Sequence, residues 1–209
     1  MIKAVIFDFD MTLANTLKQK IFLLWKFCRT DNRSIIPLLW NLPKFFGMSM
    51  KEMVAKYSDY SMPEAIKVYK HAFRETEHMI SFKGEKVIKE LQKQKYKIGI
   101  VTNELEEDVR LALKRNRIQI KNILSTVKMK KSKPDPLPLR IMMRRLKVKP
   151  SETIYVGDHP RDVMMGKRAG AVAIGLANIL HGRRTLAKYN PDYIINKLDQ
   201  IMKIINQIE

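Results

Sequence analysis

Five short apolar runs recur along the chain, and they limit the folds that this sequence can adopt. They cover residues 4–7, 97–101, 153–156, 171–174 and, more weakly, 193–195. The runs are rich in β-branched residues and lack the polar–apolar alternation of a strand with one wet face. Such runs are typical of strands that are covered on both faces. We therefore expect a sheet buried between helices.

Helical patterns separate these runs. They cover residues 85–94, 104–115, 137–146 and 198–208. Strands that alternate with helices indicate a parallel α/β sheet. Residues 15–82 differ, because they show helical patterns and no convincing strand, and Pro63 can open a helix that runs to His78. We predict a helical insert between the first strand and the rest of the sheet.

Three of the expected strands end at polar side chains. These are Asp8 and Asp10 after the first strand, Thr102 and Asn103 after the second, and Asp158 and Asp162 after the third. In an open parallel sheet, ligands bind beyond the carboxyl ends of the strands. Clustered carboxylates repel one another, and Mg²⁺ is a hard cation that binds a few carboxylates together with waters and phosphate oxygens. The pattern therefore predicts a magnesium site that could prepare a phosphoryl group for attack by a carboxylate.

Four motifs stand in order along the chain. They are Asp8-Phe9-Asp10-Met11-Thr12-Leu13, Thr102-Asn103, Lys133-Pro134-Asp135-Pro136 and Gly157-Asp158-His159-Pro160-Arg161-Asp162. Together they resemble the haloacid dehalogenase superfamily of phosphatases, over nearly the whole chain. The resemblance implies an α/β fold with a Rossmann-like parallel core of residues 1–14 and 83–209 and an inserted α-helical cap of residues 15–82. The position of the cap is phosphoglycolate-phosphatase-like.

The resemblance also implies that the first motif carries the reaction. Asp8 would attack phosphorus and form an aspartyl-phosphate. Asp10 would donate a proton to the leaving group and later activate water, which requires surroundings that favour its protonated form. The dehalogenase branch lacks this second aspartate, so Asp10 indicates a phosphatase. Met11 stands where the family usually has glycine, so the loop adopts either ordinary dihedral angles or a mildly strained conformation.

The other motifs would bind phosphate and metal. Thr102 and the backbone of Asn103 would contact phosphoryl oxygens, and Lys133 would neutralise the nucleophile and the phosphate. The implied ligands of Mg²⁺ are Asp8, the backbone carbonyl of Asp10 and Asp158, with Asp162 in support. Catalysis would then depend mainly on positioning and electrostatics, as in phosphoryl transfer generally.

Simpler structural roles for the same residues stay open from the sequence alone. Asp8 and Asp10 could be solvated turn residues that close a strand, and Thr102 could cap the helix that follows it. Lys133 could be one solvated lysine in a basic run, and Asp158 and Asp162 could be a cap and a first-turn acid of the next helix. His159 lies beside Asp158, and we interpret it as a loop residue.

The formal net charge of +19 indicates anionic partners, such as phosphorylated metabolites, nucleic acid or a membrane surface, unless it reflects only a Lys- and Ile-rich composition. Basic side chains concentrate in residues 110–149, where Asp135 is the one acid. This segment could steer anionic substrates to the site. It could also form a nucleic-acid surface, which would make the protein a nucleic-acid-associated phosphatase or binding protein. The segment has no aromatic residue on which single-stranded bases could stack.

Cysteine content and hydropathy bear on the cellular setting. Cys28 is the one cysteine, which excludes an internal disulfide and indicates a reducing, cytoplasmic location. The N-terminus does not resemble a signal peptide, and no stretch reaches the ~20 apolar residues of a membrane helix. We predict a cytoplasmic enzyme, monomer or dimer, that hydrolyses a phosphoric monoester of a small metabolite. A phosphomutase, which would keep the phosphoryl group, is the alternative with the same motifs.

Overall fold

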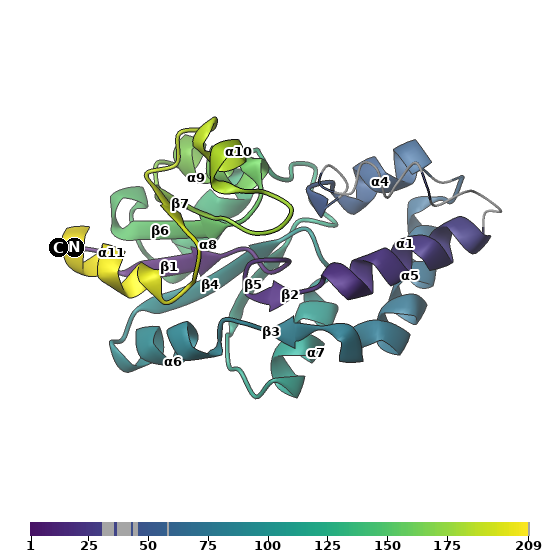
Figure 1. Cartoon of the computed structure of the whole chain (residues 1–209), viewed down its shortest axis with the longest axis horizontal. Helices are drawn as coiled ribbons and strands as arrows, with labels where there is room; N and C mark the ends of the chain where they lie inside the picture. Colours follow the sequence, from purple (N-terminus) through teal and green to yellow (C-terminus); the bar gives the residue numbers. More distant parts are fainter. Residues whose placement is uncertain (31–35, 37–42, 44–45, 58, 209) are drawn as a thin grey trace.

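The computed structural model of the chain describes residues 1–30, 36, 43, 46–57 and 59–208. Figure 1 shows strands and helices alternating along most of this length. The strands are β1 (Ala4–Phe7), β2 (Ala14–Asn15), β3 (Ser81–Phe82), β4 (Lys97–Thr102), β5 (Asn122–Ser125), β6 (Thr153–Gly157), β7 (Val172–Leu176) and β8 (Tyr193–Ile195). The helices are α1 (Leu17–Thr30), α4 (Met50–Tyr57), α5 (Met62–Thr76), α6 (Glu85–Lys93), α7 (Glu106–Arg115), α8 (Leu137–Leu146), α9 (Pro160–Ala169), α10 (Arg183–Ala187) and α11 (Gln200–Ile208).

The main sheet has the strand order β5-β4-β1-β6-β7-β8, and every neighbouring pair is parallel. The chain therefore builds outward from β1 in one direction with β4 and β5, and then in the other direction with β6, β7 and β8. The strand order reverses between β1 and β6, and such a reversal is where open α/β sheets bind ligands. The sheet confirms the predicted parallel, Rossmann-like α/β fold.

Helices cover both faces of this sheet. Ala4 and Ile6 of β1 belong to a core shared with α8 and α9, whereas Val5 and Phe7 belong to a core shared with α6, α7 and α11. All four side chains are fully buried. Burial on both faces explains why the run has no polar–apolar alternation.

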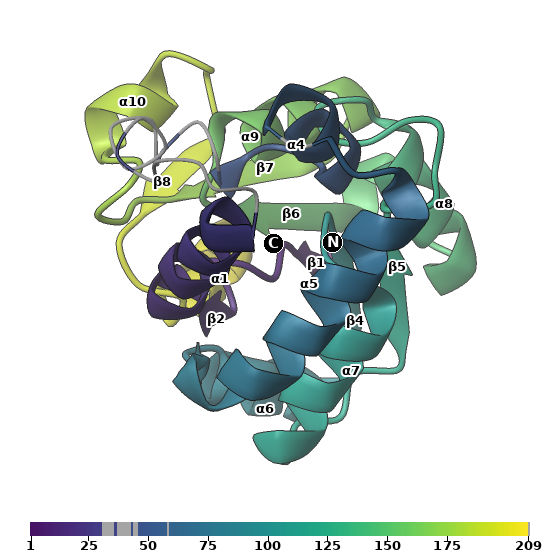
Figure 2. The same ribbon diagram turned by 90° about the vertical axis from the view of Figure 1, so that its right-hand side faces the viewer.

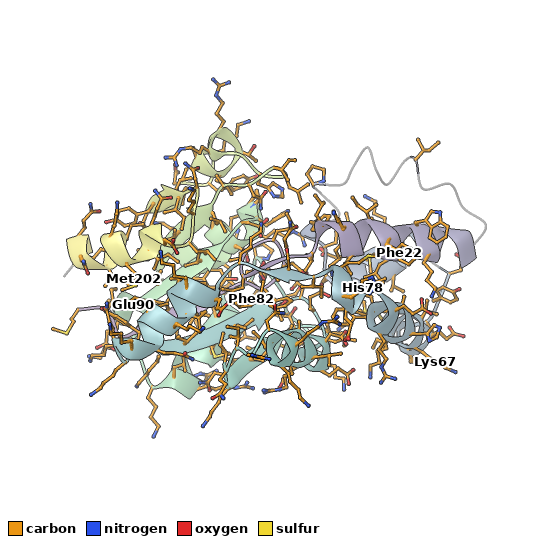
Figure 3. All side chains as sticks on the ribbon, turned by 60° about the horizontal axis from the view of Figure 1, so that its bottom comes forward. Phe22, Lys67, His78, Phe82, Glu90 and Met202 are labelled. Carbon is orange, nitrogen blue, oxygen red and sulfur yellow. The ribbon has the colours of Figure 1, made fainter. Side chains whose placement is uncertain are left out.

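Helices α1, α4 and α5, here called the helical segment, lie beyond one end of the sheet (Figure 1 and Figure 2). Both chain termini lie at the opposite end. Figure 3 shows the same polarity, with Phe22 and Lys67 at the helical end, Met202 and Glu90 at the other end, and Phe82 between them. None of the helices in the described ranges has the length and hydrophobicity that crossing a membrane requires.

The chain enters and leaves the helical segment through two short antiparallel strands. Ala14 of β2 pairs with Phe82 of β3, and Asn15 pairs with Ser81. The sequence predicted no strand within residues 15–82, and this prediction was wrong at both ends of the range. A strand of two residues has too few positions to show a period, so pattern analysis cannot detect it.

Most other predicted elements differ from the observed ones only at their ends. The helix expected from residue 104 begins at Glu106, because Leu105 is extended, with φ −65° and ψ 135°. Strand β5 was not predicted at all. It lies within the basic segment, and Ile123 and Leu124 are its two buried residues. So short an apolar run does not stand out from the lysines around it.

Candidate active site

Three neighbouring strands end at one edge of the sheet and bring polar residues together there. Phe7 of β1 is in register with Ile100 of β4 and with Val156 of β6. The residues that follow these positions therefore reach the edge at similar levels. The backbone N–H of Asp8 continues the ladder by donating to the carbonyl of Val156 at 2.8 Å. As a result, Asp8 and Asp158 lie close together although they are far apart in the sequence.

A narrow pocket opens at this edge. It is lined by Asp8, Asp10, Met11, Phe46, Gly47, Asn103, Lys133, Asp158, His159, Arg161 and Asp162. Its cavity volume is about 20 Å³, which is about the room that one ordered water needs. Phe46 and Gly47 come from the chain just before α4, so the helical side covers the pocket. The pocket has to widen before it can admit a phosphate group.

Lys133 lies between two of the carboxylates in this pocket. Its side chain is 5% exposed, and its Nζ is bonded to Asp8 Oδ1 and lies 2.7 Å from Asp162 Oδ1. Burial alone would lower the pKa of Lys133, but the charges of Asp162 and Asp8 outweigh it and raise that pKa. The ammonium group therefore stays charged beside Asp8. Lys133 is therefore buried and paired, and the alternative that it is a solvated lysine of the basic run is wrong.

Three buried carboxylates could hold a metal ion. One oxygen each from Asp8, Asp158 and Asp162 lies within 4.8 Å of the others. Asp158 is fixed by two neutral donors, Thr12 Oγ1 at 3.1 Å and Asn178 Nδ2 at 2.8 Å. Three carboxylates beside one lysine leave an excess of negative charge, which raises the cost of burial unless a cation binds. The all-oxygen donor set fits a hard divalent cation.

Asp162 is held firmly and has two roles at the start of α9. Its Oδ1 accepts a hydrogen bond from Tyr155 Oη at 2.8 Å, and its Oδ2 accepts one from the backbone N–H of His159 at 3.1 Å. The second bond caps the helix, as a carboxylate in the first turn commonly does. The predicted metal support and the simpler capping role are therefore compatible at Asp162.

Asp10 also lines the pocket, and charged residues lie behind it. Its Oδ2 is 3.3 Å from Lys20 Nζ, which lies 2.5 Å from Glu104 Oε1. Burial and the charge of Glu104 raise the pKa of Asp10 to about 8, although Lys20 opposes the shift. Burial would raise the pKa of Glu104 as well, but Lys20 and the hydrogen bonds around this carboxylate lower it to about 2. Of the two carboxyl groups, Asp10 therefore keeps its proton to higher pH than Glu104.

The second motif is divided between the pocket and the protein interior. Asn103 lines the pocket, and its Oδ1 accepts a hydrogen bond from Thr126 Oγ1 at 2.6 Å. Thr102 is buried, and its Oγ1 accepts the backbone N–H of Glu104 at 3.1 Å. The pocket in this conformation therefore includes Asn103, whereas the hydroxyl of Thr102 stabilises the turn that follows β4.

The sequence left two conformations open for the loop at Met11, one with ordinary dihedral angles and one that is mildly strained. The structure shows the strained one. The Met11 φ of 54° falls in the left-handed region, where a side chain costs roughly 1–2 kcal/mol relative to ordinary backbone angles. The side chain is only 2% exposed and lines the pocket. Burial of this side chain offsets the strain of the loop.

His159 is more than the loop residue that the sequence suggested. It caps α9, because its Nδ1 accepts the backbone N–H of Arg161 at 3.0 Å. Its ring packs edge-on against that of His181, with 4.5 Å between the ring centroids. A Cβ atom at Gly47 would lie 2.1 Å from His159 Nε2, so only glycine allows this approach. Burial lowers the pKa of His159 to about 4, which keeps the ring neutral.

Arg161 joins the helical segment to the fourth motif. Its guanidinium group makes two bonds to Glu52 of α4, at 2.6 and 3.0 Å, and a third to the carbonyl of Gly47 at 3.0 Å. The planar guanidinium group of Arg161 therefore binds both carboxylate oxygens of Glu52. These bonds hold the loop before α4 over the pocket.

Several residues at the site were not predicted from the sequence. They are Thr12, Lys20, Tyr69, Glu104, Tyr155, Asn178 and His181. Lys20 offered one usable signal, since it shares one side of α1 with the buried Leu23 and Leu24. A lysine among apolar neighbours at helical spacing indicates a buried charge with a partner.

The fold and this acidic edge define a class of Rossmann-type α/β enzymes. The chain belongs to the haloacid dehalogenase-like hydrolases, because the model of that family matches residues 5–176. This match confirms the resemblance found in the sequence motifs, and it identifies the protein as an enzyme of a hydrolase family.

Relatives and solved structures agree with this assignment. The chain is 31% identical over 214 residues to the pyrophosphatase PpaX of Bacillus velezensis, a match that covers 97% of this chain and 96% of the relative. It is 30% identical to PpaX of Bacillus mycoides, a match that covers 99% of this chain and 98% of that relative. The crystal structure of a predicted phosphatase from Clostridium acetobutylicum is similar, with a TM-score of 0.85 and 20% identity. The match covers 99% of this chain and 100% of that one. At that identity the structure supports the fold alone.

Proposed function

We propose that this chain is a Mg²⁺-dependent phosphatase that transfers a phosphoryl group from a small substrate to Asp8 and then to water. The observation that carries the proposal is the buried group of Asp8, Asp158, Asp162 and Lys133 at the carboxyl edge of the sheet. A nucleophilic carboxylate, a fixed cation and an oxygen-rich metal site are the parts that phosphoryl transfer through an aspartyl-phosphate requires.

The reaction has two steps. In the first, an oxygen of Asp8 bonds to phosphorus, the bond from phosphorus to the leaving oxygen breaks, and Asp10 gives that oxygen its proton. In the second, a water oxygen bonds to phosphorus and gives a proton to Asp10, and the bond to Asp8 breaks to release phosphate. The raised pKa of Asp10, about 8, supports its starting role as the acid.

Other residues would bind the phosphoryl group and the cation. Lys133 would offset charge on Asp8 and on the phosphoryl oxygens, and Thr102 and Asn103 would contact those oxygens. Asp8, the backbone carbonyl of Asp10 and Asp158 would hold Mg²⁺, with Asp162 in support. When bound, Mg²⁺ would neutralise charge that develops on the phosphoryl group.

The relatives guide the choice of substrate. Two of the proteins similar to this chain are pyrophosphatases, so we propose inorganic pyrophosphate as the first substrate to test, followed by monoesters of small metabolites.

We also propose the domain division 1–14 and 83–209 for the core and 15–82 for the cap. Two observations support this division: β2 and β3 pair at its boundaries, and Phe46 and Gly47 line the pocket. Residues 31–35, 37–42, 44–45 and 58 of the proposed cap lie outside the described residues. A cytoplasmic location and a monomeric or dimeric state stay predictions.

The test is release of phosphate from para-nitrophenyl phosphate and from pyrophosphate, with Mg²⁺ and with EDTA. Asp8→Asn should lose at least about 10³-fold of the Mg²⁺-dependent activity, because the amide is a poor nucleophile. Asp59→Asn, an exposed aspartate outside the pocket, is the matched control and should keep wild-type activity.

Two outcomes would contradict the proposal. Wild type that neither releases phosphate nor binds aluminium or beryllium fluoride with Mg²⁺ would exclude the aspartyl-phosphate mechanism. Transfer of the phosphoryl group within the substrate, dependent on a bisphosphate activator, would instead identify a phosphomutase. Steeply salt-dependent binding of oligonucleotides would support the nucleic-acid interpretation of residues 110–149.

A further inference from the structure

Three side chains that do not line the pocket meet beside Asp10. Lys20 Nζ lies 3.3 Å from Asp10 Oδ2, 2.5 Å from Glu104 Oε1 and 3.4 Å from Tyr69 Oη. Tyr69 Oη also donates a hydrogen bond to Glu104 Oε2. We call Lys20, Tyr69 and Glu104 the Lys20 cluster. None of its members lines the pocket in this conformation, and Lys20 connects the cluster to the side chain of Asp10.

The cluster joins two parts of the molecule at this point. Lys20 comes from α1 and Tyr69 from α5, both in the helical segment, whereas Glu104 follows β4 of the sheet. Glu104 is anchored from its own side, because its N–H donates to Thr102 Oγ1 at 3.1 Å and its carbonyl accepts from Ser125 Oγ at 2.5 Å. Contacts from both parts therefore fix the surroundings of the Asp10 carboxyl group.

A salt bridge that served only to attach the helical segment could be formed at the surface. Here the side chains of Lys20 and Glu104 are only 13% and 12% exposed. Burying an ion pair costs free energy that its own attraction often fails to recover. Proton transfer, however, depends on a donor held within a fraction of an ångström and in the correct direction. The third partner of Lys20 is the residue that would need such positioning.

We propose that Lys20 and Glu104 are positioning residues that aim the carboxyl group of Asp10 at the leaving oxygen of the substrate, with Tyr69 holding Glu104 in place. The inference rests on the proposed function, because it takes Asp10 as the proton donor. Since Lys20 and Tyr69 belong to the helical segment, Asp10 is correctly placed only when that segment is seated on the sheet.

The test is a series of aryl phosphates that range from 2,4-dinitrophenyl phosphate to phenyl phosphate. A good leaving group departs without a proton, whereas phenolate needs one, so only the poor substrates depend on a well-placed acid. Lys20→Met should lower kcat/KM for phenyl phosphate by about 10–100-fold, and for the dinitrophenyl ester by less than about 3-fold. Lys18→Met, exposed on the same helix, is the matched control and should leave both values unchanged.

Further variants separate positioning from loss of folding. Lys20→Arg should restore much of the activity on phenyl phosphate, and Tyr69→Phe, which deletes only the hydroxyl, should give a smaller selective loss of about 3–10-fold. The double variant Lys20→Met/Glu104→Gln leaves no unpaired charge in the cluster. Circular dichroism and thermal unfolding report whether each variant is folded.

The outcomes distinguish the inference from the proposed function. An equal loss of kcat/KM across the series in folded Lys20→Met and Tyr69→Phe, or no loss in either, would overturn the positioning role while leaving the phosphatase intact. Wild type without Mg²⁺-dependent turnover, or Asp8→Asn with full turnover, would defeat the proposed function, and the inference would fall with it.

Discussion

Gly157 leaves no room for a side chain, and Gly157→Ala is therefore a sharp test of the site geometry. An added Cβ would lie 2.3 Å from both Cβ and Cγ of Asp162, and 2.6 Å from its Oδ2. Asp162 cannot move aside freely, because Tyr155, His159 and Lys133 hold its carboxylate at 2.8, 3.1 and 2.7 Å. Overpacking costs about 1–3 kcal/mol and a lost hydrogen bond about 1 kcal/mol, so we expect destabilisation of roughly 2–4 kcal/mol.

Thermal unfolding followed by circular dichroism measures this cost. For a chain of this size, about 2–4 °C of Tm accompany each kcal/mol, so Gly157→Ala should lower Tm by roughly 5–15 °C. The variant should also gain less Tm than wild type when Mg²⁺ is added, because Asp162 is displaced. Gly182→Ala is the matched control, since no heavy atom lies within 4 Å of its added Cβ. It should cost at most about 1 kcal/mol, because Gly182 is the N-cap of the short helix α10 and alanine is less favourable there.

One result would refute this reasoning. If Gly157→Ala unfolds within about 1 °C of wild type and responds equally to Mg²⁺, the Asp162 carboxylate is not confined as its hydrogen bonds indicate. The end of β6 would then tolerate a side chain, and Asp162 would lose its assigned place beside Asp8.

Three further predictions concern charge. Mg²⁺ at about 100 times its Kd should stabilise the protein by about 2.7 kcal/mol in thermal unfolding, and Asp158→Asn should abolish this gain. Lys133→Met should cost about 3–5 kcal/mol in urea unfolding without Mg²⁺, because Asp8 and Asp162 lose their cation; an unchanged midpoint would contradict the pairing. Burial and neighbouring acids raise the pKa of Asp108 to about 7, so the folded state holds this proton more tightly than the unfolded state. Its contribution to stability should therefore decline as pH rises from about 4 to 7, and Asp108→Asn should be more stable than wild type at pH 8, by on the order of 1–3 kcal/mol, but not at pH 4.

The sequence predicted those parts of the fold that have a local signal. The β1 run was recognised because both faces of that strand are buried, and Asp8 was placed because it ends that run. Strand β5 escaped notice because its apolar run, Ile123 and Leu124, is too short to form a local pattern. The pair β2 and β3 escaped for the same reason.

The residues of the candidate site also fall into those that a local signal identified and those that it did not. Asp8, Asp158 and Asp162 were found because each follows a strand in a recognisable motif, and the structure brings them together. Lys20 and Glu104 were missed because each is ordinary in its own helix or loop. Only the folded chain brings them within 2.5 Å of each other. Sequence motifs thus identified groups proposed to react, whereas the groups proposed to hold them depend on tertiary contacts.

The pairing of β2 with β3 has a topological consequence. Asn15 and Ser81 are partners on adjacent strands, so the chain between them leaves the sheet and returns to the same place. It behaves like the loop of one long hairpin and adds no crossover to the order of the six strands. Loop-closure entropy grows slowly with length, about 0.6 kcal/mol for each doubling. Inserts of very different size and shape could therefore be exchanged at this point without altering the sheet that carries the carboxylates.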